Sequence, residues 1–339
     1  MTVSKRRHVP IAAASRLIRP SSRGSRPEQT NVSSRLQVVV HNRLRWIDIR
    51  KPGAQEIEYL RDEFDFHELV LEDVTSRTQR PKLDIDDDYV FIVMHFPVHN
   101  KKTRVTSASE VDLFVGDDYV ITAHDGVLRP LVGMFEQAAK SQDAREAMMG
   151  DSPAHLVYFV IDRLVEYCFP IVNRLEDRID AIEDAIFDSS SLRTVQEISV
   201  VRRDLISLRR IIKPQVAVVS QLAHRDLPML RDDIDTDVYF GDIADQLAKI
   251  WDSLDDLKEV LEGLSDTFDS LASHRLNEVI KALTVISVII LPLTLITSVF
   301  GMNVPLPYEH SSYALIIITT IMLAITGGMV LAFRLRRWI

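Results

Sequence analysis

Two stretches near the C-terminus decide the fold: residues 282–302 read ALTVISVIILPLTLITSVFGM, and residues 313–333 read YALIIITTIMLAITGGMVLAF. Each run has 21 residues and contains no charged side chain. A helix rises 1.5 Å per residue, so each run covers roughly 30 Å, which is the thickness of the hydrocarbon core of a bilayer. We therefore expect two transmembrane helices.

The short connection between the two runs fixes their topology, because the chain must cross the membrane and return at once. Basic residues flank both runs: Arg275, Lys281, Arg334, Arg336 and Arg337. The connection itself has no Lys or Arg, so the positive-inside rule places both flanks in the cytosol. We predict a first membrane helix at 282–303, an external loop at 304–312, a second helix at 313–333 and a basic cytosolic tail at 334–339. Both termini are then cytoplasmic, in a multi-pass protein of the cell (inner) membrane.

The first 36 residues differ in composition from the rest of the chain. Eight Lys and Arg side chains stand there against one acid, Glu28, among many Ser and Pro residues. This composition is typical of a disordered basic tail and also of an organellar transit peptide, and it lacks the apolar segment of a secretory signal. The whole chain has a net charge of −9, so the remaining body is more acidic still. An acidic body favours cations as partners and argues against nucleic acid.

Residues 37–150 are expected to form a cytosolic α+β domain. Three segments are rich in β-branched and aromatic residues and predict strands, which we expect to be antiparallel: 37–48, 89–97 and 111–123. The last of these is interrupted at Gly116–Asp118, which is a turn signal. Three further segments predict helices: 55–64, 67–75 and 127–140.

Residues 151–281 predict long stalk helices. In the last of them, apolar side chains recur at spacings of 3 and 4 without a break: Leu247, Ile250, Leu254, Leu257, Leu261, Leu264, Phe268 and Leu271. The apolar run begins only ten residues later. One helix is therefore predicted from about residue 242 into the membrane, with a length of about 85 Å.

The other face of this helix carries polar residues in the same register. Acids come first: Asp242, Asp245, Asp252, Asp256, Glu259 and Asp266. They are followed by Ser270, Ser273 and Asn277, and within the membrane by Thr284, Ser287, Leu291, Thr294 and Ser298. Because lipid offers hydroxyl groups no hydrogen bonds, such a stripe predicts a water-filled path or a partner helix. Two helices cannot enclose a path, so a pore requires several copies of the chain.

A second interpretation of the stripe stays open. Acids on a long helix commonly form a solvated face, and Ser or Thr side chains can bond to carbonyls of their own helix. A straight helix also drifts by about 20° per heptad from such a stripe.

The tripeptide Gly301-Met302-Asn303 stands at the outer end of the first predicted span. In this position it resembles the signature of the CorA magnesium transporters. The segment His67–Val74 (HELVLEDV) and Gln79-Arg80-Pro81-Lys82 are similar to the cytosolic signature of the same family. The resemblance covers roughly residues 37–339.

The resemblance implies a funnel-shaped homopentamer in the lipid bilayer that conducts Mg²⁺, with Co²⁺ and Ni²⁺ as secondary ions. It assigns the selectivity filter to Gly301, Met302 and Asn303, with Asn303 facing the hydrated cation. It maps Asn277 and Thr294 onto polar pore positions, and Ile280 and Leu291 onto the apolar gate. The stripe described above adds Thr284, Ser287 and Ser298 as pore-lining positions.

The resemblance also implies a regulatory cytosolic Mg²⁺ site between subunits. It pairs Asp73 of one subunit with Asp242 of the next, with Glu72 and Asp245 as nearby ligands. Bound Mg²⁺ neutralises the facing carboxylates and holds the ring closed, whereas loss of Mg²⁺ leaves like charges that repel. The alternative is that the Leu-Glu-Asp motif only ends a helix.

The sequence departs from the family pattern at the outer mouth. Phe300 replaces the common Tyr, and the loop lacks the usual Met-Pro-Glu-Leu run, which leaves Glu309 as its acid. Ion preference is therefore open, and a zinc transporter of the same superfamily is the main alternative. A membrane-anchored scaffold without transport activity is the alternative from another class.

No other motif indicates catalysis. Asp84, Asp86 and Asp88 alternate as in a calcium loop, but Tyr89 occupies the position that needs Gly, so these residues predict a turn. The sequence has no nucleophile and base set, no Gly-rich phosphate loop and one cysteine, Cys168. We expect neither an enzyme nor an ATP-driven pump.

Overall fold

The computed structural model describes residues 34–76, 79–188, 192–225, 235–302 and 313–338. Most of the predicted basic tail and the whole predicted external loop therefore lie outside the described residues. Within the described chain, strands occupy the N-terminal third and helices occupy the remainder.

The described strands are β1 (Leu36–His41), β2 (Leu44–Arg50), β3 (Lys82–Ile85), β4 (Val90–Asn100), β5 (Val105–Val115) and β6 (Tyr119–His124). The described helices are α1 (Ala54–Glu63), α2 (Glu68–Thr75), α3 (Arg129–Lys140), α4 (Gln142–Met149), α5 (Pro153–Glu166), α6 (Phe169–Asp188), α7 (Leu192–His224), α8 (Thr236–Phe300) and α9 (Ala314–Leu335).

The chain divides into two compact units. One holds Met1–Val98, Ala108–Cys168 and Ile211–Ala248, and therefore most of the sheet and its covering helices. The other holds His99–Ser107, Phe169–Arg210 and Lys249–Ile339, which include the tip of the β4–β5 hairpin, α6, and the membrane half of α8.

The strands form one sheet in the order β1-β2-β6-β5-β4-β3. The pairs β1–β2, β3–β4 and β5–β6 are antiparallel, as expected from the sequence. The pair β2–β6 is parallel, with Ile47 opposite Ile121, so the antiparallel prediction was wrong there. Sequence patterns give strand positions but not partners, and parallel neighbours need a long crossover, which α1, α2 and three strands supply here.

The predicted strand 37–48 is two strands in the structure. Asn42 takes a left-handed backbone, with φ of 53°, between β1 and β2. Asn tolerates this conformation better than most residues, which allows a tight hairpin where the apolar pattern alone suggested continuity. The turn predicted at Gly116–Asp118 is confirmed, because β5 ends at Val115 and β6 begins at Tyr119.

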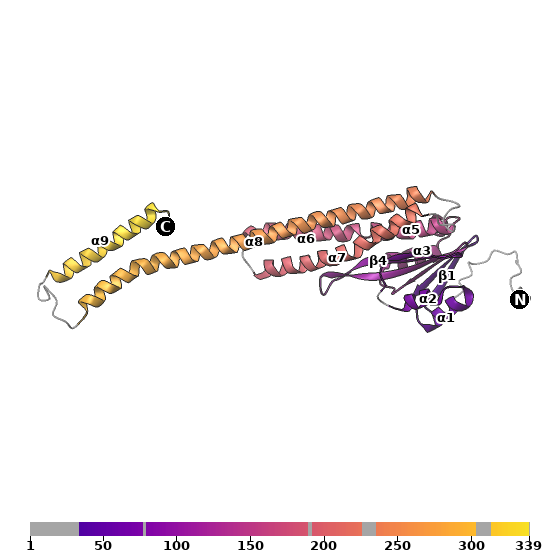
Figure 1. Ribbon diagram of the computed structural model, residues 1–339, viewed down its shortest axis with the longest axis horizontal. Helices are drawn as coiled ribbons and strands as arrows, with labels where there is room; N and C mark the ends of the chain where they lie inside the picture. Colours follow the sequence, from indigo (N-terminus) through magenta and orange to yellow (C-terminus); the bar gives the residue numbers. More distant parts are fainter. Residues whose placement is uncertain (1–33, 77–78, 189–191, 226–234, 303–312, 339) are drawn as a thin grey trace, which may run out of the picture. The chain divides into compact units, whose positions relative to one another are not determined.

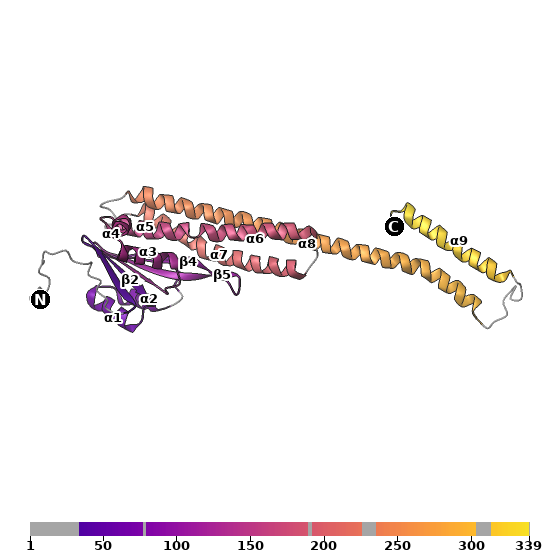
Figure 2. The ribbon, with the colours of Figure 1, turned by 180° about the vertical axis from the view of Figure 1, so that it is seen from behind.

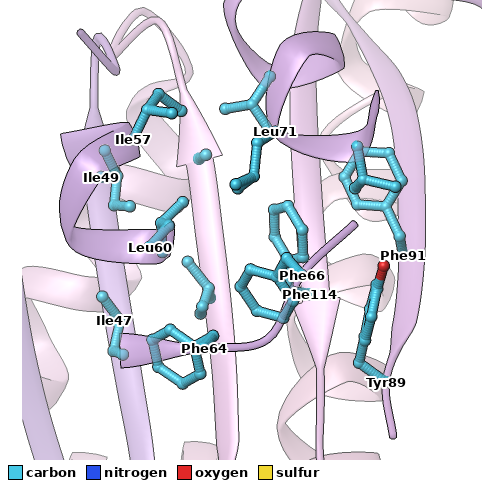
Figure 3. Packing of buried hydrophobic residues seen from close by; sticks show 14 of the residues in the cluster. Ile47, Ile49, Ile57, Leu60, Phe64, Phe66, Leu71, Tyr89, Phe91 and Phe114 are labelled. Carbon is cyan, nitrogen blue, oxygen red and sulfur yellow. The ribbon is translucent and has the colours of Figure 1, made fainter. Parts of the chain in front are cut away.

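One face of the sheet forms an apolar core with α1 and α2. Figure 3 shows Leu60 of α1 and Leu71 of α2 above the strands, near Ile47 and Phe114. Phe66, in the connection between the two helices, stacks on Phe114 with ring centroids 4.4 Å apart. Alternation along each strand places these side chains on a single face.

The opposite face carries a buried polar network. The Asp48 carboxylate is fully buried and accepts hydrogen bonds from Thr122 at 2.8 Å and from Arg50 at 2.8 Å. His124 Nε2 lies 3.0 Å from the same carboxylate. Burial alone would raise the pKa of Asp48, but hydrogen bonds with His124, Arg50 and Thr122 and the electrostatic attraction of His124 outweigh it and lower the pKa.

The second unit is built on helices that run side by side. Both ribbon views show α6 and α7 beside α8 (Figures 1 and 2). Arg209 of α7 forms an ion pair with Asp255 of α8, and its guanidinium lies 4.4 Å from the ring centroid of Trp251. Asp204 of α7 accepts a hydrogen bond from the Thr106 amide at 2.6 Å, which holds the tip of the β4–β5 hairpin.

The helix α8 is continuous from Thr236 to Phe300, as Figures 1 and 2 show. Its 65 residues correspond to about 100 Å, so the prediction of one helix that continues through the first apolar run is confirmed, with a start six residues earlier than expected. The helices α8 and α9 both contain segments long and apolar enough to cross a bilayer. Their side chains are largely exposed in one chain, as at Leu291 and Leu315.

Candidate functional site

All seven predicted pore-lining residues lie on α8. Four of them, Ser287, Leu291, Thr294 and Ser298, line one open groove of about 620 Å³ along the membrane part of the helix. The groove is completed by Ile286, Ile290 and Leu295. The other three, Asn277, Ile280 and Thr284, lie closer to the N-terminal end of the same helix. The heptad spacing therefore places hydroxyl and apolar positions on one shared face.

The hydroxyl groups of this face donate to their own helix. Thr284 Oγ1 lies 2.7 Å from the Ile280 carbonyl, Ser287 Oγ lies 2.8 Å from the Leu283 carbonyl, and Thr294 lies 3.0 Å from the Ile290 carbonyl. Each hydroxyl proton is used inside the helix, so each oxygen presents its lone pairs outward. Both sequence interpretations thus describe part of the arrangement, because back-bonding leaves a row of hydrogen-bond acceptors.

A row of acceptors suits a hydrated cation. The water molecules around Mg²⁺ direct their hydrogens outward, and Mg²⁺ releases those waters reluctantly. Oxygen acceptors on Ser287 and Thr294 can therefore receive hydrogen bonds from the hydration shell. The flanking apolar side chains Leu291 and Ile290 offer no such interaction. Positions that can accept hydrogen bonds from water therefore alternate with apolar positions along this face.

The first two residues of the predicted filter lie at the end of α8. The Gly301 amide donates to the Thr297 carbonyl at 2.9 Å, and a Cβ atom at this position would lie 3.0 Å from that same oxygen. A side chain there would need the neighbouring backbone to move, which favours Gly at this point. Met302 is exposed. Asn303, the predicted ion-facing residue, lies outside the described residues.

The predicted cytosolic ligand Asp73 lies on α2 and is partly buried. Its Oδ1 accepts a hydrogen bond from Gln79 Nε2 at 2.8 Å, and its Oδ2 accepts one from Lys82 Nζ at 2.7 Å. Glu72, the preceding residue, is exposed. Asp73 and Lys82 line a pocket of about 370 Å³ together with His67, Leu69, Val70, Asp84, Ile85, Asp86 and Tyr89.

The Lys82 ammonium is shared between two carboxylates. It lies 2.7 Å from Asp73 and 2.6 Å from Asp84. Burial alone would lower the pKa of Lys82, but the hydrogen bonds to Asp73 and Asp84 outweigh it and raise the pKa. The lysine is therefore charged at neutral pH.

The second predicted ligand, Asp242, lies in the second turn of α8, and Asp245 is exposed nearby. Gln246 Nε2 donates to Asp242 Oδ2 at 2.8 Å and to Asp162 Oδ1 of α5 at 3.2 Å. Burial, followed by the charges of Glu166 and Asp242, raises the pKa of Asp162, and the hydrogen bond from Gln246 only partly offsets this.

Asp162, Gln246 and Lys82 were not identified as site residues from the sequence. Asp162 and Gln246 are separated by 84 residues and meet only because α5 packs against α8 within the same unit. Lys82 belonged to a motif that was recognised, but nothing in its sequence spacing indicated that it would contact Asp73. The types of these residues could be read from the sequence, but the contacts between them could not.

Asp73 and Asp242 show no hydrogen bond or ion pair with each other among the described residues. No three His, Cys, Asp or Glu side chains of the described chain converge as the ligands of a metal ion.

Asp86 and Asp88 lie in the turn between β3 and β4, as predicted, whereas Asp84 lies within β3, which ends at Ile85. The Asp86 amide donates to the Tyr89 carbonyl at 2.9 Å before β4 begins. The Asp86 side chain accepts from the Asp87 amide at 2.8 Å, so it stabilises the turn.

The chain is similar to a known family of proteins. Residues 41–337 match the family described as CorA-like Mg²⁺ transporter protein. YfjQ of Bacillus subtilis is 33% identical over 294 residues, which cover 86% of this chain and 89% of that protein. The cobalt/magnesium transport protein CorA of Thermotoga maritima is 29% identical, over 87% of this chain and 83% of that protein.

A more distant relative carries a different ion in its name. The zinc transport protein ZntB of Yersinia pseudotuberculosis is 21% identical over 76% of each chain. Among solved structures, the complete CorA magnesium transporter of Methanocaldococcus jannaschii matches with a TM-score of 0.76, over 92% of this chain and 98% of that chain. Its sequence identity is 19%, so this match shows the fold.

Proposed function

The chain belongs to the CorA-like Mg²⁺ transporter proteins, and from this premise we propose that it carries Mg²⁺ into the cytosol through a pore made by several copies of itself. As a member of that family, it is a membrane transporter of divalent cations and not an enzyme. The identity of the ion, the assembly, the orientation in the membrane and the gate are what we propose.

The observation that carries the pore is the groove on α8. It gathers Ser287, Leu291, Thr294 and Ser298 on one face, and the acceptor oxygens described above point out of the helix. One helix cannot enclose water, so the face needs equivalent faces from other subunits around an axis. We propose a homopentamer in which Asn277 and Ile280 extend this lining toward the cytosol.

Selectivity is assigned to the outer end of α8. Gly301 permits a close approach of the backbone, and Asn303 presents an amide oxygen to the hydrated ion, in line with the family resemblance. Oxygen ligands that hold the water shell favour Mg²⁺ over softer ions. Cobalt and nickel are secondary ions of the proposal.

The driving force is the membrane potential. With the flanks of the two spans in the cytosol, a divalent cation gains about 4.6 kcal/mol for each 100 mV of inside-negative potential. Neither ATP nor a second substrate is needed for inward transport.

The gate is assigned to the cytosolic carboxylates. Asp73 of one subunit and Asp242 of the next bind Mg²⁺ through its waters, with Glu72 and Asp245 nearby. The contacts support one addition, because Gln246 joins Asp242 to Asp162 and so brings a third carboxylate toward the same region. High cytosolic Mg²⁺ stabilises the closed ring, and its loss leaves repelling charges.

A zinc transporter remains the second candidate. The relation to ZntB and the departures at Phe300 and in the outer loop support it. A scaffold without transport is the weaker candidate, because a tether gives no reason for the groove on α8.

The test is ion influx into proteoliposomes that hold the purified full chain and a Mg²⁺-sensitive dye. We expect influx that grows with inside-negative potential and is lost in Asn303→Ala. The matched control is Asn173→Ala on the exposed surface of α6, which should keep wild-type influx. Influx of Zn²⁺ but not Mg²⁺ would favour the zinc candidate, and no influx of any divalent ion would favour the scaffold.

A further inference from the structure

Lys82 forms an ion pair with Asp73, the carboxylate that the proposed gate uses to bind a cation. Its ammonium lies 2.7 Å from Asp73 and 2.6 Å from Asp84, and it lies 5.3 Å from the centroid of the Phe91 ring. Asp73 is partly buried, and its other oxygen already accepts from Gln79. Both oxygens of the carboxylate therefore have partners inside the same chain.

The position of this lysine is set by strand pairing. Lys82 is opposite Val93 and Asp84 is opposite Phe91, so both β3 side chains share the sheet face that α2 covers. Val93 and Phe91 are fully buried members of the core below α2. The packing that fixes α2 on the sheet therefore also fixes Asp73 over Lys82.

We propose that Lys82 competes with the regulatory cation for Asp73. When the cation is absent, the Lys82 ammonium binds Asp73, and when the cation binds, the ammonium moves to Asp84. This inference rests on the cytosolic gate proposed above and adds a residue that sets its affinity. Binding of the cation at this site then replaces the Lys82 ammonium beside Asp73 with the divalent cation.

The exchange follows from the charges in contact with Asp73. A hydrated divalent cation donates hydrogen bonds through its waters to carboxylate oxygens, so it must share or displace the donors already there. An ammonium group at 2.7 Å from Asp73 repels that cation. Lys82 therefore reduces the affinity of Asp73 for Mg²⁺ without removing the ligand.

Asp84 makes the displacement feasible. Its side chain is about half exposed, at 48%, so it remains hydrated and can hold the ammonium alone. The pocket of about 370 Å³ that Asp73, Lys82 and Asp84 line provides the space for a shift. Without Asp84, a displaced lysine would lose its counter-charge.

The surroundings are short of positive charge. The buried Asp112 of β5 has an oxygen with no hydrogen-bond partner among the described residues. Burial, then the charges of Glu110 and Asp73, hold the pKa of Asp112 well above its ordinary value, and Lys82 only partly offsets this. The pocket itself is lined by three aspartates, Asp73, Asp84 and Asp86, and one lysine, so a further cation is favoured there.

The first test uses Lys82→Met in the full-length protein in detergent. For each variant, the thermal unfolding midpoint is followed as Mg²⁺ is added, and the concentration for half of the full shift is recorded. We expect this concentration to fall about three- to tenfold in Lys82→Met, because a neighbouring charge on a partly exposed site is screened. Each variant is compared with its own Mg²⁺-free midpoint, so a loss of stability is not mistaken for a change in affinity.

Two variants control for charge and for general effects. Lys82→Arg keeps the positive charge, so the half-effect concentration should stay close to that of the wild type. Lys140→Met removes an exposed lysine of α3 that pairs with Glu136 at 3.6 Å, and it should also leave the value unchanged. An equal fall in Lys140→Met would show a loss of general charge and would overturn the proposal.

The second test changes the alternative partner. Asp84→Asn should raise the half-effect concentration about two- to threefold, because Lys82 then has only Asp73. In the Lys82→Met background, the same change should have a clearly smaller effect, because no ammonium remains to be moved. Equal effects in both backgrounds would mean that Asp84 acts as a simple attractive charge, which contradicts the exchange.

Asp73→Asn separates this inference from the proposed gate. If Asp73→Asn weakens the response to Mg²⁺ and Lys82→Met leaves it unchanged or weakens it, the gate stands and the competition is wrong. If Asp73→Asn leaves the response to Mg²⁺ as in the wild type, the gate itself is wrong and the inference fails with it.

Discussion

The sheet and the membrane half of α8 satisfy their side chains in opposite ways. In the sheet, Phe114 and Asp48 are fully buried and find their partners within the same chain. On α8, Leu291 and Leu295 are exposed in one chain, at 70% and 62%. In one chain, the sheet domain therefore satisfies its own side chains, whereas the apolar half of α8 leaves its side chains exposed.

The largest expected effect breaks the sheet side of the comparison. Phe114→Ala removes a ring that stacks on Phe66 at 4.4 Å and contacts Phe91 at 4.7 Å. The cavity should lower the free energy of unfolding by about 3–5 kcal/mol. Thermal or denaturant unfolding of the purified full chain measures this loss.

The matched change on α8 is Leu291→Ala. Because Leu291 is exposed in one chain, the free energy of unfolding of the sheet domain should change by less than about 0.5 kcal/mol. Ion influx should change instead, since Leu291 lies in the groove with Thr294. A large loss of domain stability in Leu291→Ala would contradict the division between the two regions.

A smaller effect concerns Asp112, one oxygen of which has no hydrogen-bond partner within the described part of the chain. The pKa of Asp112 is raised in the folded protein, first by burial and then by Glu110 and Asp73. A raised carboxyl pKa stabilises the fold below the ordinary pKa of Asp, near 3.9, and this contribution is lost as pH rises through the folded value. Asp112→Asn cannot titrate, so its stability should exceed that of the wild type increasingly from pH 4 to pH 8.

The measurement is the difference in unfolding midpoint between Asp112→Asn and the wild type across that pH range. At neutral pH the gain should be on the order of 1–3 kcal/mol, the cost of a buried unsatisfied polar group. A difference that does not depend on pH would mean that the Asp112 carboxyl titrates normally.

The smallest expected effect on stability sharpens the membrane side. Thr294→Val keeps the shape of the side chain and removes the oxygen that faces out of α8, while the bond to the Ile290 carbonyl is lost. Stability should change by less than about 0.5 kcal/mol because the residue is exposed. Influx of Mg²⁺ into proteoliposomes should fall, and Thr294→Ser should retain it.

Thr320→Val on α9 is the control. Thr320 bonds to the Ile316 carbonyl at 2.7 Å in the same manner, but it lies on the second span. If Thr294→Val and Thr320→Val lower influx equally, the groove on α8 is not the special path that we propose.

The predictions that came from the sequence concern features written in local patterns. The charge-free runs, the continuous helix through the membrane boundary and the turn at Gly116–Asp118 each depend on residues close together in the chain. The family resemblance likewise depends on short motifs such as Gly301-Met302-Asn303. The placement of Asp73 on a helix end was also available from its neighbours.

The strand pairing and side-chain contacts that the sequence did not predict depend on residues far apart in the chain. The parallel pairing of β2 with β6, and the bridge from Gln246 to Asp162, are brought about by packing across more than 70 residues. The contact of Lys82 with Asp73 is shorter in sequence, yet it depends on how α2 lies over β3. Periodicity and composition report which face of an element is apolar, but burial of that face against a particular neighbour decides which charges meet.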